Sequence, residues 1–275
     1  MIGQLLLIPC NLKKRILKAA TRKGGSTEEV CRLNMEIGEV FAKATLSLLK
    51  KTKISSRKIY AIGSHGQTIC HLGREGTLQI GESSVIAERT SITTVADFRP
   101  ADIASGGLGA PLIPYFHSIL FQQTGKSRAV HNIGGISNLT FLPKGSKFKG
   151  VFGFDTGPGN MLMDAAVVHF TKGKKHFDDQ GKIAAKGFVS LMLLKELMSH
   201  SFIAHQPPKT AGREEFGHHL LEKILKRSQK MGLRFEDILA TLTAFTAQSI
   251  AENYRRFVFP KEVPEEIIFW RWWES

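Results

Sequence analysis

Apolar side chains in the first part of the chain follow two different periods. In residues 34–50 they recur at intervals of three, four and seven, which predicts an amphipathic helix. Residues 58–64 carry apolar side chains that lead into a glycine and predict a short strand, and residues 92–95 are a second β-type run. The stretch between them is rich in Gly, Ser and Thr, which favours turns and short strands over long helices.

The pair Gly134-Gly135 lies between two further apolar runs. Residues 127–132 and 139–142 predict strands, and the glycines predict the turn that joins them. Residues 151–154 predict another strand directly before a run of small residues. This part of the chain therefore predicts a sheet.

Helical patterns dominate from residue 161 onward. Residues 189–198 and 236–257 predict helices, and Pro260 ends the second. Residues 266–269 predict the start of one more strand. Strands and helices in this order predict an α/β fold class.

Composition narrows the class of protein. The chain has 275 residues, and its 42% hydrophobic content is ordinary for a globular protein. Its three cysteines form no CxxC pair, which argues against a disulfide framework or a zinc site and fits a reducing compartment. Since no apolar stretch approaches the roughly 20 residues that span a bilayer, we expect a cytoplasmic protein without a membrane partner.

The formal net charge of +14 suits an anionic ligand. Lys and Arg are spread along the whole chain, with small clusters at residues 13–15, 50–53 and 172–175. No aromatic residues interleave with them as stacking platforms, so we expect no nucleic-acid partner. A basic surface that attracts an anion such as a nucleotide is the simpler interpretation.

Candidate chemistry is concentrated in four segments where small residues surround a few polar ones. They are residues 63–68, 97–111, 131–138 and 153–160. Small residues allow the backbone to approach a ligand closely. The segments therefore predict binding or catalysis better than the helical parts of the chain do.

The last of these segments, Gly-Phe-Asp-Thr-Gly-Pro-Gly-Asn, carries Asp155 at the end of an apolar strand. Thr156 and the three residues after it must turn sharply, and Asn160 is placed to cap the helix that begins at Met161. An acidic residue beside glycines can serve as a general base. The alternative is a strand–turn–helix junction in which Asp155 only binds turn amides.

Two other features have two interpretations each, and a pair of histidines has one. Gly134-Gly135 predicts a hairpin or a loop whose amides meet phosphate oxygens. Arg99 predicts a carboxylate-binding side chain or an ion pair with Asp97 or Asp102. His65 and His71 have no third ligand near them in the sequence, so we expect no metal at side chains.

Six motifs taken together resemble the anhydro-N-acetylmuramic acid kinase family. They occur in a consistent order and cover nearly the whole chain. The motifs are GSHGQTICH at 63–71, TLQIGE at 77–82, VADFRPADIASGGLGAPLIP at 95–114, NIGGISNLTFLP at 132–143, GFDTGPGNMLMD at 153–164 and PPKTAGRE at 207–214.

The resemblance implies a two-lobed actin-like ATPase, with a ribonuclease H-like fold, that closes over ATP. Residues 1–126 would form the N-terminal lobe and residues 127–275 the C-terminal lobe. The enzyme would open the 1,6-anhydro ring of 1,6-anhydro-N-acetylmuramic acid with water and phosphorylate O6, giving N-acetylmuramic acid 6-phosphate in cell-wall recycling. Mg²⁺ would accompany ATP, and relatives suggest a homodimer.

Roles pass to individual residues where the motifs match. Asp155 matches the aspartate that activates water at the anomeric carbon. The second phosphate-binding loop is matched by Asn132, Gly134, Gly135 and Asn138. The positions expected to bind the sugar are His65, Gln67, Asp97, Arg99 and Asn160, with Arg99 as the partner of its lactyl carboxylate.

Both ends of the sequence depart from the family. Its first phosphate-binding loop, of the type MSGTSxDG, has no counterpart before residues 1–16. Residues 269–275 read FWRWWES where the family has a Ser-Gly-Gly-Gly loop around the adenosine, and glycines appear when the tryptophan codons are read one base later. We therefore expect a chain truncated at both ends, with a frameshift near codon 269. The alternative to an active kinase is an inactive remnant that binds only the sugar or a protein partner.

Overall fold

The computed structural model describes residues 8–21, 24–145 and 148–270, in which helices and short strands are interspersed. The chain divides into two units, Met1–Ala110 and Pro111–Ser275. The mixture of helices and sheets confirms the predicted α/β class. The expected losses at the two ends concern segments before residue 8 and after residue 270, which lie outside the described residues.

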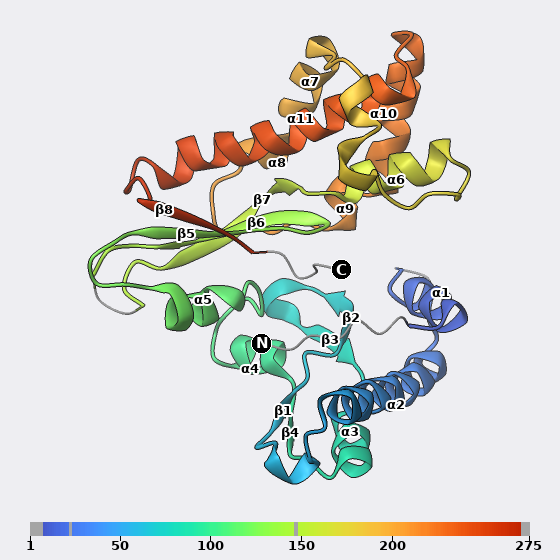
Figure 1. The fold of residues 1–275 in the computed structure, drawn as a ribbon, viewed down its shortest axis with the longest axis vertical. Helices are drawn as coiled ribbons and strands as arrows, with labels where there is room; N and C mark the ends of the chain where they lie inside the picture. The colour runs from blue at the N-terminus through green and yellow to red at the C-terminus, as the bar shows by residue number, and fades with distance from the viewer. Residues whose placement is uncertain (1–7, 22–23, 146–147, 271–275) are drawn as a thin grey trace. The chain divides into compact units, whose positions relative to one another are not determined.

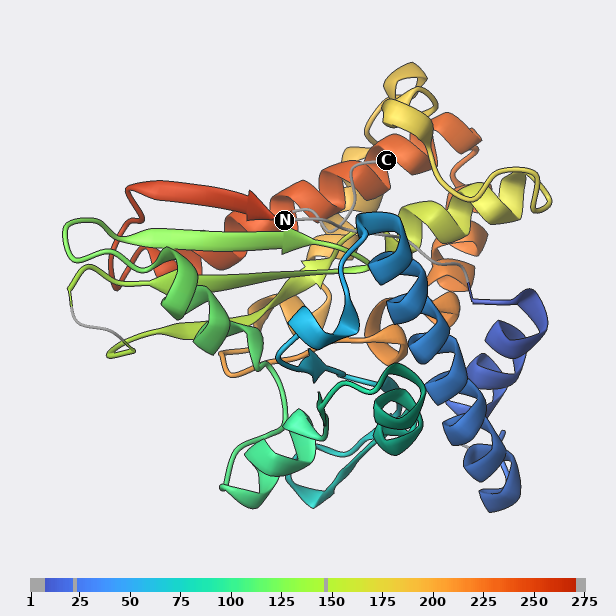
Figure 2. The same cartoon turned by 60° about the horizontal axis from the view of Figure 1, so that its bottom comes forward.

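Helix α2, Thr27–Thr52, is the longest element of the first unit (Figure 2). It begins after Ser26, whose hydroxyl accepts a hydrogen bond from the Glu29 amide at 3.2 Å. It ends at Lys53, which adopts the left-handed conformation typical of a helix C-terminus. The helix predicted over residues 34–50 is confirmed and is longer at its N-terminal end.

The first unit has one main core and two small sheets. The core is built from α1, α2 and β3, and its buried members are Leu12, Ile16, Ala19, Leu33, Ile37 and Ile80. The other elements are α1 (Cys10–Ala19), β1 (Ile62–Gly63), β2 (Gln67–His71), β3 (Thr77–Ile80), α3 (Ser83–Thr90), β4 (Thr94–Val95) and α4 (Phe98–Ala104). Strand β1 runs parallel to β4, and β2 runs antiparallel to β3.

The strand predicted over residues 58–64 is wrong in its first half. Residues Ser56–Lys58 form a turn of 3-10 helix, and only Ile62 and Gly63 pair with β4. An apolar run alone does not make a strand where no partner backbone runs beside it.

A four-stranded sheet forms the centre of the second unit (Figure 1). Its strands are β5 (Arg128–Ile133), β6 (Ile136–Leu142), β7 (Phe152–Pro158) and β8 (Glu266–Trp270). The spatial order is β7-β6-β5-β8; the first three strands are antiparallel, and β8 runs parallel to β5. The strands predicted on either side of Gly134-Gly135 are confirmed, and so is the one predicted from residue 266.

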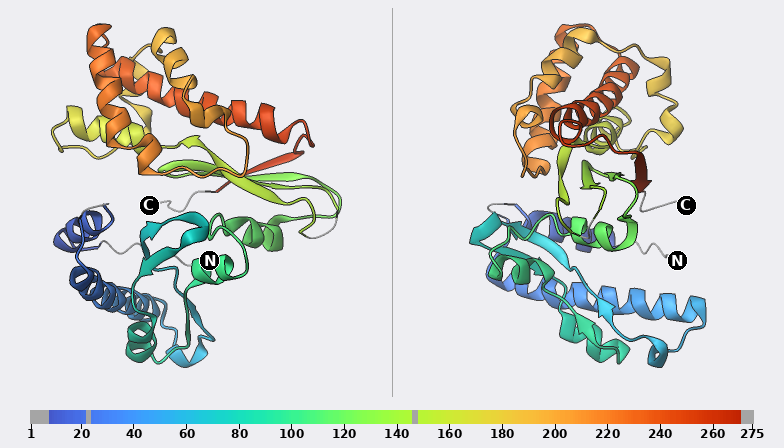
Figure 3. Two further views of the ribbon diagram at one scale, coloured as in Figure 1. Left: turned by 180° about the vertical axis from the view of Figure 1, so that it is seen from behind. Right: turned by 90° about the vertical axis from the view of Figure 1, so that its left-hand side faces the viewer.

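Helices cover both faces of this sheet (Figures 1 and 3). Helix α5, Ile113–Phe121, lies on one face, where His117 hydrogen-bonds to Thr140 (Nδ1–Oγ1 2.9 Å). Helix α11, Phe235–Asn253, lies on the other and continues into a π-helical turn, Tyr254–Val258. The core between the sheet and this turn consists of Ala129, Leu139, Phe141, Phe154, Tyr254 and Val258.

The remaining helices form an apolar cluster beyond β7. They are α6 (Met161–Phe170), α7 (Leu191–Met198), α8 (Ser201–Ala204), α9 (Arg213–Phe216) and α10 (His218–Lys230). The cluster that they share with α11 is centred on the fully buried Phe216, Leu239 and Phe245. The predicted dominance of helices after residue 161 is confirmed. In the described part of the chain, no helix has the length and apolarity that crossing a membrane requires.

Candidate active site

Three of the predicted site residues lie in one row across the sheet of the second unit. Asn132 on β5 is directly opposite Asn138 on β6, and Asn138 is opposite Asp155 on β7. Opposite residues of neighbouring strands present their side chains on the same face. Both asparagines are half-buried, and neither side chain makes a hydrogen bond within the described residues. Polar groups that are partly desolvated without internal partners are suited to binding a ligand.

Asp155 is held at its backbone and at one carboxylate oxygen. Its amide donates to the carbonyl of Lys209 at 3.1 Å, and the Ala211 amide donates to its Oδ2 at 2.7 Å. Oδ1 accepts no hydrogen bond from the part of the chain that the structure describes. One oxygen therefore fixes the orientation of the carboxyl group, and the other is left for a ligand or water.

The electrostatic surroundings of Asp155 suit a general base. Burial raises the pKa of its carboxyl to about 6, and the nearby charge of Glu214 acts in the same direction. The Ala211 amide and the charge of Lys209 oppose this rise by favouring the carboxylate. A carboxyl group with a pKa near 6 is ionised at neutral pH and still basic enough to take a proton from water.

The strand that carries Asp155 does not end where the sequence predicted. β7 continues to Pro158, so Asp155 lies in its middle, and the predicted turn at residues 156–159 is wrong. A bulge opposite Ser137 and Asn138 absorbs the extra residue, and Gly157 supplies the positive φ of 133°.

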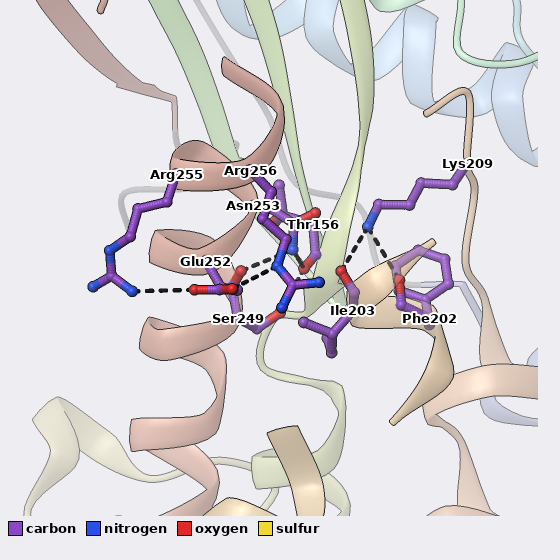
Figure 4. A network of polar contacts seen from close by, with 9 residues as sticks. All are labelled: Thr156, Phe202, Ile203, Lys209, Ser249, Glu252, Asn253, Arg255 and Arg256. Carbon is purple, nitrogen blue, oxygen red and sulfur yellow. Dashed lines mark hydrogen bonds and ion pairs between the residues drawn. The ribbon is translucent and has the colours of Figure 1, made fainter. Parts of the chain in front are cut away.

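The carbonyl of Thr156, in this bulge, accepts hydrogen bonds from α11 (Figure 4). The Ser249 hydroxyl and the Asn253 amide group donate to the carbonyl of Thr156 at 2.5 and 2.9 Å. All three residues are fully buried. The local conformation beside Asp155 is therefore determined by a helix almost a hundred residues later in the chain.

The helix after this strand, α6, begins at Met161 as predicted, but the predicted cap by Asn160 is wrong. Asn160 has helical φ and ψ of −89° and −8°, and its side chain makes no capping bond. The amides of Gly159 and Asn160 instead donate to the carbonyls of Gly135 and Gly134, at 2.9 and 2.8 Å. The side chain of Asn160 is left half-buried beside the glycine turn.

The Gly134-Gly135 turn is thereby attached directly to the segment that carries Asp155. Its carbonyls face the start of α6, and the amide of Gly134 donates to Ile136 at 3.3 Å. The amide of Gly135 has no acceptor among residues 8–21, 24–145 and 148–270. The two interpretations of Gly134-Gly135, a hairpin and a ligand-facing loop, are therefore compatible, since the hairpin leaves the Gly135 amide unsatisfied.

A chain of buried hydrogen bonds crosses the sheet on its α11 side. Thr156 donates to the Ser137 hydroxyl at 2.8 Å, and Ser137 in turn lies 2.8 Å from Nε2 of His131. Nδ1 of His131 lies 3.2 Å from the Tyr254 hydroxyl. Burial lowers the pKa of His131 to about 4, so the ring is neutral, with one nitrogen accepting and the other donating. This series of hydrogen bonds fixes strands β5, β6 and β7 against each other.

In the first unit, Arg99 and His65 are in direct contact. Nε of Arg99 donates to Nε2 of His65 at 2.9 Å, and Nη1 donates to the Gly109 carbonyl at 3.4 Å. Nδ1 of His65 lies 2.9 Å from the Gly66 carbonyl, so this nitrogen carries the proton. Arg99 forms no ion pair with Asp97 or with any other carboxylate of the described residues. Asp102 accepts from the Gly109 amide at 2.8 Å. Burial lowers the pKa of the Arg99 guanidinium, which has no anion to compensate its charge.

The other two predicted residues of this unit are less constrained. Gln67 begins β2, and its side chain donates to the Thr68 carbonyl at 3.2 Å. Asp97 is exposed, has a left-handed φ of 60°, and does not cap α4 with its side chain. In the described residues no group of three His, Cys, Asp or Glu side chains could hold a metal ion, and His71 hydrogen-bonds to Thr77 (Nδ1–Oγ1 3.1 Å).

Sequence reasoning missed Lys209 and the polar groups of α11. Lys209 lies within PPKTAGRE, so the motif marked the segment, but no local pattern indicated that its side chain is buried near Asp155. Ser249 and Asn253 lie four apart on a helix and read as ordinary polar positions. The buried side of α11 also carries Thr241 and Thr246 among apolar residues, and polar residues on a mainly apolar helix side were the one available signal.

Comparisons with known proteins agree on one family. The family model described as anhydro-N-acetylmuramic acid kinase matches residues 1–263. The curated kinase of that name from Caldanaerobacter subterraneus subsp. tengcongensis is 43% identical over 266 residues, which are 94% of this chain and 67% of the relative. Its counterparts from Bacillus cereus (strain ZK / E33L) and Clostridioides difficile (strain 630) are 41% and 40% identical, over 94% and 93% of this chain and 69% and 67% of their own lengths.

Structural similarity adds nothing to this. A solved structure of the ethanolamine utilization protein EutJ from Carboxydothermus hydrogenoformans aligns with 59% of this chain and 58% of its own, at 12% identity and a TM-score of 0.20, which is too low to support an argument. The sequence relatives span the segments that carry the candidate site. On the family model and these identities, the chain belongs to the anhydro-N-acetylmuramic acid kinase family.

Proposed function

We propose that the chain acts as an ATP-dependent kinase on 1,6-anhydro-N-acetylmuramic acid, with Asp155 as the base that activates water. The family supports the reaction. The observation that carries the role of Asp155 is its carboxyl group, with one oxygen fixed by the Ala211 amide and the other available. Its pKa of about 6 gives the ionised form at neutral pH.

The proposed chemistry uses one proton acceptor. Water gives its proton to Asp155 as its oxygen bonds to the anomeric carbon, and the bond between that carbon and O6 breaks. O6 takes the terminal phosphoryl group of ATP, so the products are N-acetylmuramic acid 6-phosphate and ADP. The proton held by Asp155 then returns to solvent. Since the base must be ionised, turnover is expected to rise as the pH passes upward through about 6.

The glycine turn and its neighbours are proposed to bind the phosphates of ATP. Within the described residues, the amide of Gly135 and the side chains of Asn132 and Asn138 have no hydrogen-bond partner, which supports their availability to anionic oxygens. The carbonyl of Gly134 accepts from the Asn160 amide, which holds the turn against the start of α6. Mg²⁺ that enters with ATP would be held through the phosphates that this turn and the two asparagines bind, and it would offset their negative charge.

We propose that His65, Gln67, Asp97 and Arg99 of the first unit bind the sugar. Sugar binding by Asn160 of the second unit is a separate proposal, which rests on the motif match alone. The arrangement of Arg99 supports its role in binding the sugar. A half-buried guanidinium without a carboxylate partner can bind the lactyl carboxylate of the sugar, while its contact with His65 fixes the plane of the group.

We also propose a fold family for the two units. The two units are interpreted as the N- and C-terminal lobes of an actin-like ATPase with a ribonuclease H-like fold, predicted over residues 1–126 and 127–275. An antiparallel meander followed, after helices, by a strand parallel to its first strand supports this assignment for the second unit. Residues 111–126 group with the second unit, because α5 packs on its sheet.

The function is tested by incubating the chain with 1,6-anhydro-N-acetylmuramic acid and Mg-ATP and identifying the products by mass spectrometry. The expected product is N-acetylmuramic acid 6-phosphate with one ¹⁸O atom at the anomeric position when the reaction is run in H₂¹⁸O. Calorimetric titration with the sugar alone distinguishes an active kinase from an inactive remnant. Binding without ADP formation would support a remnant that binds the sugar. Neither binding nor turnover would contradict the kinase and leave only a remnant that binds a protein partner.

Arg99→Gln is expected to weaken binding of the sugar roughly 10- to 100-fold, because a charge-assisted pair of hydrogen bonds to the carboxylate is lost. The measurement is isothermal titration calorimetry with the anhydro sugar. Arg74→Gln, at an exposed arginine of the same unit, is the matched control and should leave the affinity unchanged. Equal affinities for the Arg99 variant and the parent chain would remove Arg99 from the sugar site.

A further inference from the structure

Lys209 has a buried ammonium group close to the candidate base. Its side chain is 7% exposed, and Nζ donates to the carbonyls of Phe202 and Ile203 at 3.0 and 3.3 Å (Figure 4). No carboxylate of the described residues lies within ion-pair distance of it. A buried charge without an ion-pair partner is costly, so its presence calls for an explanation.

Three aromatic rings from three different elements surround this ammonium. Nζ lies 5.8 Å from the ring centroid of Phe154 on β7, 4.9 Å from that of Phe202 on α8, and 4.8 Å from that of Phe257 in the π-helical turn. Aromatic faces attract a cation and offset part of its lost hydration. Burial lowers the pKa of Lys209 to about 8, so the amine is still mainly protonated at neutral pH.

The backbone on either side of this side chain is what holds Asp155. The carbonyl of Lys209 accepts from the Asp155 amide, and the amide of Ala211 donates to the Asp155 carboxylate. The buried ammonium therefore anchors the segment that orients the base. Two other charged groups act on this pair. Glu214 on α9 acts on Asp155, and Arg256 on the π-helical turn acts on Lys209. Arg256 is itself paired with Glu252 at 2.5 Å.

We propose that Lys209 is a positioning residue for Asp155: it anchors residues 209–211 against β7 and adds a positive charge that favours the ionised base. The role in catalysis rests on the proposed function. The electrostatic coupling does not, because it is a property of the chain without substrate. A purely structural lysine would fill the same space without altering the ionisation of Asp155.

The coupling is measured by NMR titration of chains labelled with ¹³C at the aspartate carboxyl, with Asp155→Asn to assign the signal. Lys209→Met is expected to raise the Asp155 midpoint by roughly one pH unit, since an opposite charge at several ångströms is lost. Lys261→Met is the matched control, because Nζ of the exposed Lys261 lies 3.8 Å from the Phe152 ring centroid on the same strand. The proposal is overturned if Lys209→Met and Lys261→Met leave the midpoint equally unchanged.

Two further measurements keep the proposal testable if Lys209→Met folds poorly. Lys209→Arg retains the charge and should keep the Asp155 midpoint close to that of the parent chain. Coupling is also reciprocal, so Asp155→Asn should lower the midpoint of the Lys209 amine, followed by NMR of ¹³Cε-labelled lysine, by the same roughly one unit. An unchanged Lys209 midpoint in that variant would overturn the proposal without any substitution at Lys209.

Turnover distinguishes failure of this inference from failure of the proposed function. If the chain converts the sugar, the acid limb of its kcat/KM profile should move upward in Lys209→Met by the same amount as the NMR midpoint. A uniform loss of rate at every pH, with the midpoint unmoved, would show a structural role only. If the chain converts no sugar but the midpoint moves, the proposed function fails and the positioning of Asp155 stands.

Discussion

Asp155→Asn is expected to lower kcat for turnover of the anhydro sugar by about 10³-fold or more, within the range that general bases contribute. Asparagine keeps the size of the side chain, and its carbonyl oxygen can still accept from the Ala211 amide, but it cannot take a proton from water. Binding of ATP, measured by calorimetry, should stay within about twofold of the parent value. A variant that retains a tenth of the activity would exclude Asp155 as the base.

The same substitution is expected to stabilise the folded chain at neutral pH. The folded-state pKa of Asp155, about 6, lies above the ordinary value of 3.8, so the folded chain holds this proton more tightly than the unfolded chain does. Stability therefore falls as the pH rises from about 4 to about 6, and the cost is fully present above that range. The shift corresponds to at most about 3 kcal/mol, and we expect Asp155→Asn to recover about 1–2 kcal/mol at pH 7.5.

Urea unfolding at two pH values tests this sign. The gain in unfolding free energy should be present at pH 7.5 and should nearly vanish at pH 4, where the carboxyl of the folded chain is already protonated. Asp97→Asn, at an exposed aspartate, is the control and should change stability by less than about 0.5 kcal/mol at either pH. Loss of stability in Asp155→Asn at pH 7.5 would show that the carboxylate contributes more through its hydrogen bond than burial removes.

Much of the secondary structure of the second unit could be predicted from short stretches of sequence. The glycine pair between two apolar runs predicted the β5–β6 hairpin, and the period of three and four predicted α11, because both depend on residues close in the chain. The row of Asn132, Asn138 and Asp155 needed the register between strands, which no single run of residues specifies. The family resemblance named these residues, whereas the structure supplied the reason that they lie together.

Other parts of the site depend on partners that are distant in sequence. Strand β7 continues past Asp155 because Ser249 and Asn253 bind the Thr156 carbonyl. The glycines and the proline after Asp155 predict a turn when the contacts of α11 are not known. Likewise, the buried state of Lys209 follows from rings on β7, α8 and the end of α11. Long-range packing of this kind overrides local turn chemistry and leaves no periodic signal in the sequence.

The second large effect is expected from Gly159→Ala. A Cβ at this position would lie 2.0 Å from the carbonyl oxygen of Gly134 and 3.3 Å from that of Gly135. The residue cannot move away freely, because its amide donates to Gly135 and its carbonyl accepts from the Thr246 hydroxyl, both at 2.9 Å. The new Cβ would clash with backbone atoms, and no flexible side chain is available to move aside. We therefore expect the unfolding free energy to fall by about 3 kcal/mol or more.

The same clash should affect nucleotide binding before it unfolds the chain. Pushing the Gly134-Gly135 turn away from α6 displaces the Gly135 amide from the row of Asn132 and Asn138, so the KM for ATP should rise at least about tenfold in whatever fraction remains folded. Gly125→Ala is the matched control, because a Cβ there meets no atom within 4 Å and the residue has no positive φ. Urea unfolding and ATP titration of both variants check the prediction. If Gly159→Ala matched Gly125→Ala in both measurements, the turn would be free to move relative to α6, and its proposed role in holding phosphates against the segment of Asp155 would lose its structural basis.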